Sequence, residues 1–362
     1  MHLRKAASIA AVCLAAVGVN AEPDMSFSGY LDADVWTDLA GNYFTNSEFD
    51  LGLSLKFSEE VSANLYATIN QLNSASGVGR IPAGGGSPSE RWITANFDGF
   101  DISYASPIGT FSVGDLVYQF GGFNYYFYKR LSMITPENFT RGVKYSNTFG
   151  PVTQTLLAGV ADIDNNSGDV LGTTEFSLGG QSVKAIYGVR GSAITSFDDG
   201  FNLVGGVEYE GTLGEMLSVK ADVGYLGLPG ETRTNIFTFL VEPSLSFGKA
   251  SVAGTFYAML DADSVNDALS ALGLPLYGIG DEMFAYVEPG YSFSDVIAAG
   301  LPIEYHAGLL DDENDNQFWV VPTMYVYPTD GVEWWLWGQV VVPTAENSDL
   351  LYGLGSEIIV KF

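Results

Sequence analysis

Few residues of this 362-residue chain have the chemistry of a catalytic site. His306 is the only histidine after residue 2, with Glu304 two positions before it, and the single cysteine, Cys13, lies in the N-terminal apolar stretch. A serine hydrolase needs a serine, a histidine and an orienting polar residue assembled in space, and the chain offers no phosphate-binding loop and no zinc-ligand spacing. We therefore predict a structural histidine and no enzymatic activity.

Two acidic runs supply the oxygen ligands that calcium prefers. They are Asp162 to Asp169 and Asp311 to Asp315. The first departs from the calcium-loop pattern, because Ser167 stands where a glycine belongs and Thr173 stands at the twelfth position in place of glutamate. We interpret both runs as solvated loops and expect no cofactor, with loop calcium as the alternative.

The composition indicates an apolar but acidic protein. Hydrophobic residues make up 47% and charged residues 16%, whereas soluble domains carry about 25% charged residues. There are 43 Asp and Glu against 15 Lys and Arg, a formal charge of -28. Such a surface repels phosphates, so we expect no nucleic-acid partner. An exported barrel with an apolar band facing lipid explains the composition better than a soluble β-sandwich.

The last thirteen residues predict a strand with one apolar face. Every second residue from Leu350 to Phe362 is apolar except Ser356, and the residues between them are mostly small or charged. A period of two places one face in an apolar medium and the other in a polar one. The segment resembles the closing strand of bacterial outer-membrane β-barrels. That resemblance implies that barrel-assembly machinery is a partner and reads this strand, with Tyr352, Ile358, Val360 and Phe362 as its signal.

The same alternation recurs as hairpins along the chain. Residues 51–57 and 61–69 alternate apolar with polar side chains on either side of a turn at 58–60, and related units occupy 241–254, 287–300 and 321–334. An apolar outside and a polar inside is the reverse of a soluble barrel. Proline removes a donor from the sheet, so we expect the prolines of these units near strand ends or bulges.

Short turns alternate with long polar connections. We predict short turns near Glu59, Ile108, Gly150, Gly180, Leu213, Lys249, Asp295 and Thr329, and long connections at 73–90, 117–138, 162–172, 261–281 and 311–317. Eight such turns and termini on the same side give 18 strands. Residues 173–190 could instead hold one strand, and Asp98-Gly99 could be a hairpin or a bulge. The fold class is therefore all-β, a transmembrane antiparallel up-and-down β-barrel of 16 to 18 strands, with 14 also open.

The segment Gln119 to Asn138 is the longest aromatic connection. The strand before it, Gly109 to Asp115, is similar to the "GTxxVGR" strand that precedes the inward-folded third loop of the general, trimeric bacterial porins, and Arg141 to Tyr145 resembles the strand after that loop. Porins usually have arginine where this chain has Asp115. The resemblance implies a pore constriction, for which the candidates are Tyr126, Tyr128, Lys129, Arg130 and Glu137; the alternative is an extracellular loop whose aromatics form a girdle.

Every second residue of a strand points to the same face, so charged side chains in step with the polar residues are expected to line the lumen. A charge at the lipid midplane costs about 2–4 kcal/mol for Lys or Arg, which makes an inward position nearly obligatory. The candidates are Asp34, Lys56, Lys144, Lys184, Arg190, Glu208, Lys220, Asp222, Glu288 and Glu304. The excess of acids favours cations over anions, unless many carboxylates lie at the rims or pair with the bases.

Five aromatic residues share this inward parity. Stacking on sugar rings is one use of lumenal aromatics, as in the saccharide-specific porins, and interfacial belts are the commoner one. The residues are Trp36, Tyr66, Tyr286, Trp335 and Trp337.

The N-terminus has the pattern of an export signal. Arg4 and Lys5 precede an apolar run to Val19, and small residues at 19–21 offer a cleavage site. About 14 apolar residues are too few to span a membrane, and no later stretch approaches the ~18 needed. We expect residues 1–21 to be a signal peptide and residues 22–362 to be one outer-membrane barrel domain.

Together these features predict an outer-membrane porin, a passive water-filled channel for small hydrophilic solutes, with a preference for cations. The alternatives are a saccharide-selective porin and a plugged structural or adhesive barrel. The porin resemblance implies a homotrimer in outer-membrane lipid.

Overall fold

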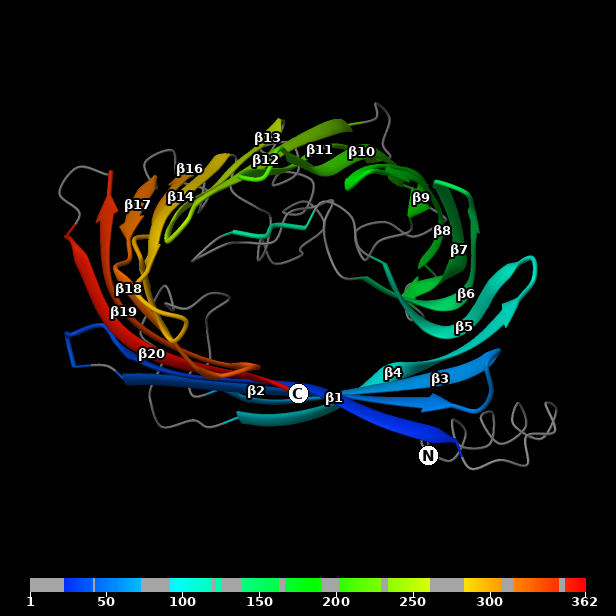
Figure 1. Ribbon diagram of the computed structural model, residues 1–362, viewed down its shortest axis with the longest axis horizontal. Helices are drawn as coiled ribbons and strands as arrows, with labels where there is room; N and C mark the ends of the chain where they lie inside the picture. Colours follow the sequence, from blue (N-terminus) through cyan, green and yellow to red (C-terminus); the bar gives the residue numbers. More distant parts are fainter. Residues whose placement is uncertain are drawn as a thin grey trace.

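The computed structural model describes residues 23–41, 43–72, 92–118, 122–125, 138–162, 167–190, 202–228, 234–260, 283–307, 316–344 and 349–362. Its strands form one sheet that closes on itself as an 18-strand antiparallel barrel (Figure 1). The expected range of 16 to 18 strands is thus confirmed at its upper end. None of the helices among these residues is long and apolar enough to cross a membrane.

The sheet contains twenty strand segments because two of the 18 strands are interrupted. The interruptions lie at Leu301-Pro302 and Val321-Pro322, where each strand continues beyond the break. The segments are β1 Asp24–Thr37, β2 Tyr43–Lys56, β3 Val61–Leu72, β4 Trp92–Ser106, β5 Gly109–Tyr118, β6 Asn138–Phe149, β7 Val152–Asp162, β8 Ser167–Leu178, β9 Gln181–Arg190, β10 Asn202–Leu213, β11 Leu217–Leu228, β12 Thr234–Phe247, β13 Ala250–Leu260, β14 Met283–Ser292, β15 Ile297–Gly300, β16 Ile303–Ala307, β17 Gln317–Val320, β18 Thr323–Thr329, β19 Val332–Pro343 and β20 Leu351–Lys361.

The terminal strand closes the barrel against the first one. β20 pairs antiparallel with both β19 and β1, so neither strand has a free edge. Backbone hydrogen bonds join Gly29 and Phe362 in both directions, at 2.8 and 3.1 Å. A Cβ on Gly29 would lie 2.2 Å from the ring of Phe362, so a side chain there would displace the C-terminal aromatic ring.

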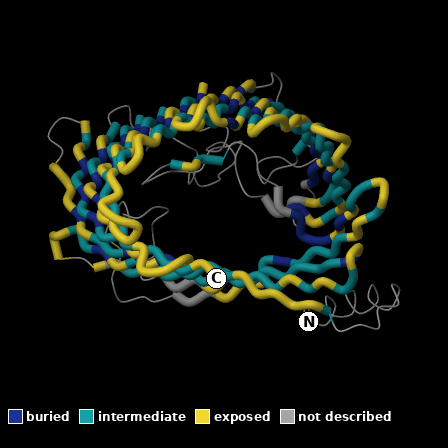
Figure 2. The backbone as a smooth tube through the Cα atoms, viewed as in Figure 1, coloured by how far each residue is buried: buried dark blue, intermediate teal, exposed yellow. Residues whose placement is uncertain are grey.

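The alternation in the sequence becomes an inside and an outside. Large apolar side chains stand exposed on the outer wall, whereas the intervening ones face the interior. On β20 the outward row includes Tyr352, Ile358 and Phe362, each more than 40% exposed, while Glu357 and Ile359 are buried (Figure 2). The outer wall is therefore the apolar band of a membrane barrel.

The short turns lie where the sequence predicts them. Each of the eight joins consecutive strands in two to four residues, and Gly150, Gly248 and Gly331 adopt positive φ in three of them. Both ends of the described chain lie at this rim, because Asp24 pairs with Lys56 and the amide of Lys361 bonds to the carbonyl of Gly331.

Several local expectations are decided by the pairing. Residues 173–190 hold parts of two strands, β8 and β9, and Asp98-Gly99 is a bulge, since the β3–β4 register shifts there. The connection expected at 162–172 is shorter, because β7 extends to Asp162 and β8 begins at Ser167. Asp169 is thus a strand residue.

The expectation for prolines is wrong at two positions. Pro243 lies within β12 and Pro289 within β14, whereas Pro302 and Pro322 occupy the strand interruptions. The ladder between β12 and β13 skips the residue pair at Pro243, and the carbonyl of Pro289 accepts the amide of Leu301. The missing donors are tolerated because the ladders are already incomplete beside both prolines.

One ion pair stands on the outer wall. Arg141 donates to Asp115 through Nε at 2.6 Å and through Nη2 at 3.1 Å. Both residues share parity with Val113 and Val143, which are more than half exposed on the outside. The Asp115 side chain is 8% exposed and also accepts the amide of Phe100. The residue that departs from the porin pattern is therefore neutralised on the membrane-facing wall.

Candidate functional site: the barrel interior

A short segment of the long aromatic connection lies inside the barrel. Glu242 of β12 accepts the amide of Asn124 at 2.8 and 3.0 Å and the amide of Tyr125 at 3.2 Å. The hydroxyl of Thr255 lies 2.9 Å from Glu242 and 2.8 Å from the carbonyl oxygen of Tyr125. A carboxylate that accepts several backbone amides is a strong anchor. Residues 122–125 are therefore bound to a part of the wall that lies more than a hundred residues later in the sequence.

Further contacts hold the start of this segment. Lys220 donates to the carbonyl of Gly122, and the ring of Phe123 packs 5.1 Å from Tyr257 and 5.9 Å from Phe284. The segment appears as a short piece within the ring of strands (Figure 1). The expected constriction residues Tyr126, Tyr128, Lys129, Arg130 and Glu137 lie outside the described residues.

The bases beside this segment are paired with acids. Lys184 and Lys220 both reach Glu208, at 2.8 and 3.9 Å. Arg190 lies 3.6 Å from Asp169, to which Thr140 also donates. The expected lumen residue Asp222 is buried in the same cluster, across the ladder from Glu208. This wall is charged but largely compensated.

The wall formed by β1 to β4 is different, because most of its inward side chains stay half-exposed and the charged ones are acidic with one exception. The hydroxyl of Thr68 lies 2.6 Å from a carboxylate oxygen of both Asp50 and Asp98. Among the described inward side chains of these four strands, Lys56 is the one base, and it lies at the short-turn rim. The acids are Asp24, Asp32, Asp34, Glu48, Asp50, Asp98 and Asp101.

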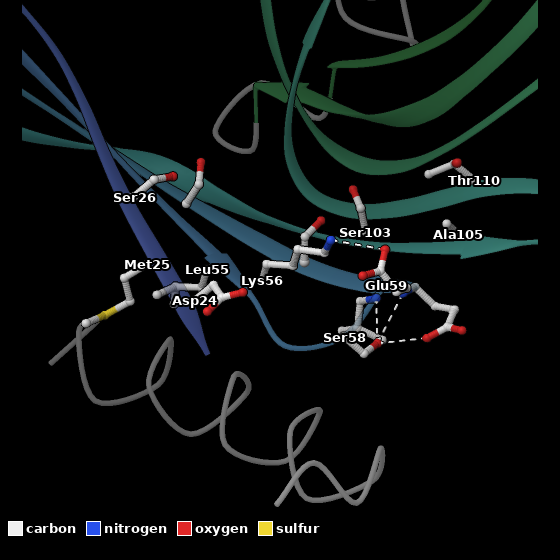
Figure 3. A pocket seen from close by; sticks show the side chains of 14 residues that line it. Asp24, Met25, Ser26, Leu55, Lys56, Ser58, Glu59, Ser103, Ala105 and Thr110 are labelled. Atoms are coloured by element: carbon white, nitrogen blue, oxygen red, sulfur yellow. Dashed lines mark hydrogen bonds and ion pairs between the residues drawn. The ribbon is translucent and has the colours of Figure 1, made fainter. Parts of the chain in front are cut away.

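Lys56 belongs to a hollow of about 400 Å3 at that rim. It donates to Glu59 at 3.1 Å, among Ser58, Ser103 and Thr110 (Figure 3). Parity predicts that Lys56 faces inward, but it does not predict the height of Lys56 along the barrel axis. Its charge stands at the short-turn rim, where it is shared with Glu59.

Three further candidates fall at three different places. Asp34 faces inward on β1 and accepts the amide of Asn46 at 3.0 Å. Lys144 faces inward on β6, across from the buried Ser112. Glu304 is fully buried beside His306, with 3.0 Å between Oε2 and Nε2, and the His306 ring lies 4.9 Å from Phe284. Glu304 therefore does not meet the lumen, and His306 is held as a wall residue.

The five inward aromatic residues lie at three places. Trp36 and Trp337 are buried in the wall, and Gly355 makes room for the indole of Trp337. Tyr66 points toward Asp101 on the acidic wall, at 3.4 Å. Tyr286 and Trp335 instead line a cavity of about 390 Å3 directly against the in-folded segment.

This cavity contains the candidate lumen residue Glu288. Tyr286 and Tyr325 both donate hydroxyl hydrogen bonds to its carboxylate, the latter at 2.6 Å. Tyr325 and Trp335 meet edge to face with ring centroids 5.3 Å apart. Asn124 and Tyr125 complete the lining.

Sequence reasoning missed some of these residues. It indicates that Glu242 faces inward, but not that it binds a loop, because that contact depends on the closed barrel. Tyr325 was missed although its alternation with Met324 and Val326 was available, since Pro322 interrupts the pattern just before it. Among the residues in view, no group of three or more His, Cys, Asp or Glu could hold a metal ion; the run 311–315 lies outside them.

No protein-family model and no curated protein matches this chain. Solved structures do match. OpdK of Pseudomonas aeruginosa, solved with vanillate, has 8% identity and a TM-score of 0.59 over 94% of this chain and 98% of that one. A BenF-like porin of Pseudomonas fluorescens Pf-5 gives the same values. OccK11 (OpdR) of Pseudomonas aeruginosa has 8% identity and a TM-score of 0.58, over 94% of this chain and 96% of that one. The closed barrel and its apolar outer wall are thus the fold of the bacterial outer-membrane porins.

Proposed function

We propose that this protein is an outer-membrane channel through which small hydrophilic solutes pass passively, with a preference for cations. The observation that carries the proposal is the half-exposed wall of β1 to β4, whose charged side chains are acidic except Lys56. On the opposite wall Lys184, Lys220 and Arg190 are paired with carboxylates, which leaves Lys144 on β6 as a half-buried inward base. A pore whose accessible charge is negative concentrates cations and repels anions.

The test is electrical. The refolded mature protein, residues 22–362, would be inserted in a planar bilayer, with conductance and reversal potential recorded in a salt gradient. Steady steps with a reversal potential of the sign expected for cations would support the proposal. Anion selectivity would overturn the charge argument, and silence from demonstrably folded barrels would overturn the channel in favour of a plugged or adhesive barrel.

The segment fastened inside the barrel supports the constriction as well. Tyr125 is held at the wall, and we propose that residues following it along the chain narrow the pore. These constriction residues are Tyr126, Tyr128, Lys129, Arg130 and Glu137. The inward-facing charges named above would act on solutes in proportion to their exposure.

A selective channel is the second candidate, and the aromatic cavity around Glu288 favours it. One of the similar structures, OpdK, was solved with vanillate. A saccharide-selective porin would show oligosaccharide inhibition of the ion current from both sides of the bilayer.

Two partners complete the proposal. The outward apolar row of β20, ending at Phe362, supports recognition by barrel-assembly machinery. Homotrimers remain an expectation from the porin resemblance, to be tested by whether unheated detergent samples migrate at three times the monomer mass.

A further inference from the structure

We infer that the cavity around Glu288 binds small organic cations, alkylammonium ions above all. The inference deepens the proposed function and rests on it for the route by which a ligand arrives. Its starting point is the cavity itself, about 390 Å3, which is within the range of small-molecule sites.

The lining is aromatic with one charge. Five of the lining residues bring aromatic rings to the inner side of the wall, and Glu288 is the one charged residue among those that line the cavity in the described part of the chain. The rings are Tyr125, Tyr286, Tyr325, Tyr327 and Trp335, whereas Tyr291 borders the cavity but has the outward parity of Val287. Aromatic faces attract a cation whose charge is spread over methyl or methylene groups, and a carboxylate adds the counter-charge.

Glu288 is held in place as a carboxylate. Tyr286 and Tyr325 each donate to a different oxygen of Glu288, and each oxygen keeps a further lone pair. Gly300 lies behind it, where a Cβ would come within 2.0 Å of Oε1. The two hydroxyls are thereby committed to the carboxylate, which leaves the rings themselves to meet a ligand.

The same features disfavour two other ligand classes. An aromatic carboxylate would meet Glu288 without a compensating base in the lining. A sugar carries no charge to match Glu288, and the hydroxyls of Tyr286, Tyr325 and Thr323 are already bonded to Glu288 and to the carbonyl of Val321. The polar side chains of Asn124, Ser244, Ser251 and Ser292 would remain for a sugar.

The position favours a function in transport. Asn124 and Tyr125 line the cavity and belong to the in-folded segment. Both strand interruptions reach this place, since Pro302 and Thr323 also line the cavity. A solute passing the segment would therefore meet the rings and the carboxylate of Glu288 directly.

The test compares choline with its neutral carbon analogue, 3,3-dimethylbutan-1-ol, and with glucose, by calorimetry on the folded protein in detergent. We expect choline to bind at least fivefold more tightly than the analogue. Glu288→Gln should weaken choline at least tenfold and leave the analogue unchanged, whereas Glu210→Gln on β10 should have no effect. Tyr325→Phe and Trp335→Leu should each weaken choline, with Tyr66→Phe as the matched aromatic control.

Equal binding of choline and the analogue, no effect of Glu288→Gln in folded protein, or glucose binding in preference to choline would each overturn the inference. Folding would be checked by the heat-dependent shift in gel migration. Binding in detergent does not depend on conductance. Cation-selective conductance without choline binding would therefore refute the organic-cation site and leave the channel in place. Choline binding in a barrel that conducts no current would refute the diffusion channel and leave the organic-cation site in place.

Discussion

Glu242 shows how one residue can position a functional segment. Its carboxylate gathers two backbone amides of the in-folded segment and the hydroxyl of Thr255. Removing it would leave those donors without their buried acceptor, at about 1–3 kcal/mol each in the worst case. The segment would then lose its attachment to β12.

We predict that Glu242→Ala raises single-channel conductance and current noise, because the segment no longer stays against the wall. Bilayer recordings on wild-type and variant protein would measure both. Glu210→Gln, also inward-facing but without a contact to the segment, is the control. Unchanged conductance and noise in folded Glu242→Ala would show that other contacts suffice.

Gly29 is decisive for the closing seam, because the ring of Phe362 occupies the space that a side chain would need. We predict that Gly29→Val lowers the free energy of unfolding by about 1–3 kcal/mol, the usual cost of overpacking. Urea unfolding followed by tryptophan fluorescence would measure it. Gly205→Ala, where the nearest atom is 3.9 Å from the added Cβ, should change little. A similar loss at both positions would argue against a specific slot.

At the scale of elements, strands β5 and β6 carry a charge pair on the wall that faces lipid. Asp115 is almost covered, and Arg141 is 60% exposed at its side chain. Paired and bidentate, the two charges are tolerable; alone, Asp115 would be a covered charge without a partner. Arg141 therefore contributes to stability mainly by neutralising the covered charge of Asp115, and less by the attraction within the pair itself.

We predict that Arg141→Leu destabilises the barrel by about 2 kcal/mol, an order-of-magnitude value for a lost charged hydrogen-bond pair. Adding Asp115→Asn to it should recover part of the loss, since the uncompensated charge is then gone. Chemical unfolding in lipid vesicles would give both values. A double variant less stable than the single one would refute this account.

The prolines act on elements too. Pro243, Pro289, Pro302 and Pro322 fall on β12, β14 and the two interrupted strands. Each lacks a donor, and the ladders skip or break beside them. The interrupted part of the sheet borders the cavity that holds Glu288.

The whole molecule has an asymmetric interior. Around β6 to β19 many inward side chains are buried, and Lys184, Lys220 and Arg190 are paired with acids, whereas most of the acids of β1 to β4 are half-exposed (Figure 2). A solute path along the acidic wall would sense its field, because low-dielectric walls focus charge within a pore. Selectivity is thus a property of the arrangement and not of any one carboxylate.

We predict that Asp50→Asn combined with Asp98→Asn reduces the cation preference, seen as a smaller reversal potential in the same salt gradient. The effect should be larger at low than at high salt, because screening shortens the reach of the field. Glu304→Gln is the control, since Glu304 is fully buried. An equal change in the control would locate selectivity elsewhere.

The sequence by itself determined much of this architecture. Period-two alternation in 51–57, 61–69 and 350–362 predicted one face for each side chain, and the glycine and polar turns limited the strand number to 16 to 18, with 14 open, because both are local properties of the backbone. Parity proposed Asp34, Lys184 and Glu288 as lumen residues, and their action on solutes stays a prediction. For Asp98-Gly99 the sequence left a hairpin and a bulge open, and the structure has the bulge.

Only the tertiary structure decided what these residues meet. That Glu242 binds Asn124, that Glu304 is covered while Asp50 is not, and that Tyr325 joins Glu288 all depend on contacts between strands far apart in sequence. Alternation fixes a face but carries no information on depth or on which distant side chain lies opposite. Those quantities come from closing the sheet, which brings remote strands around one interior and places a loop inside it.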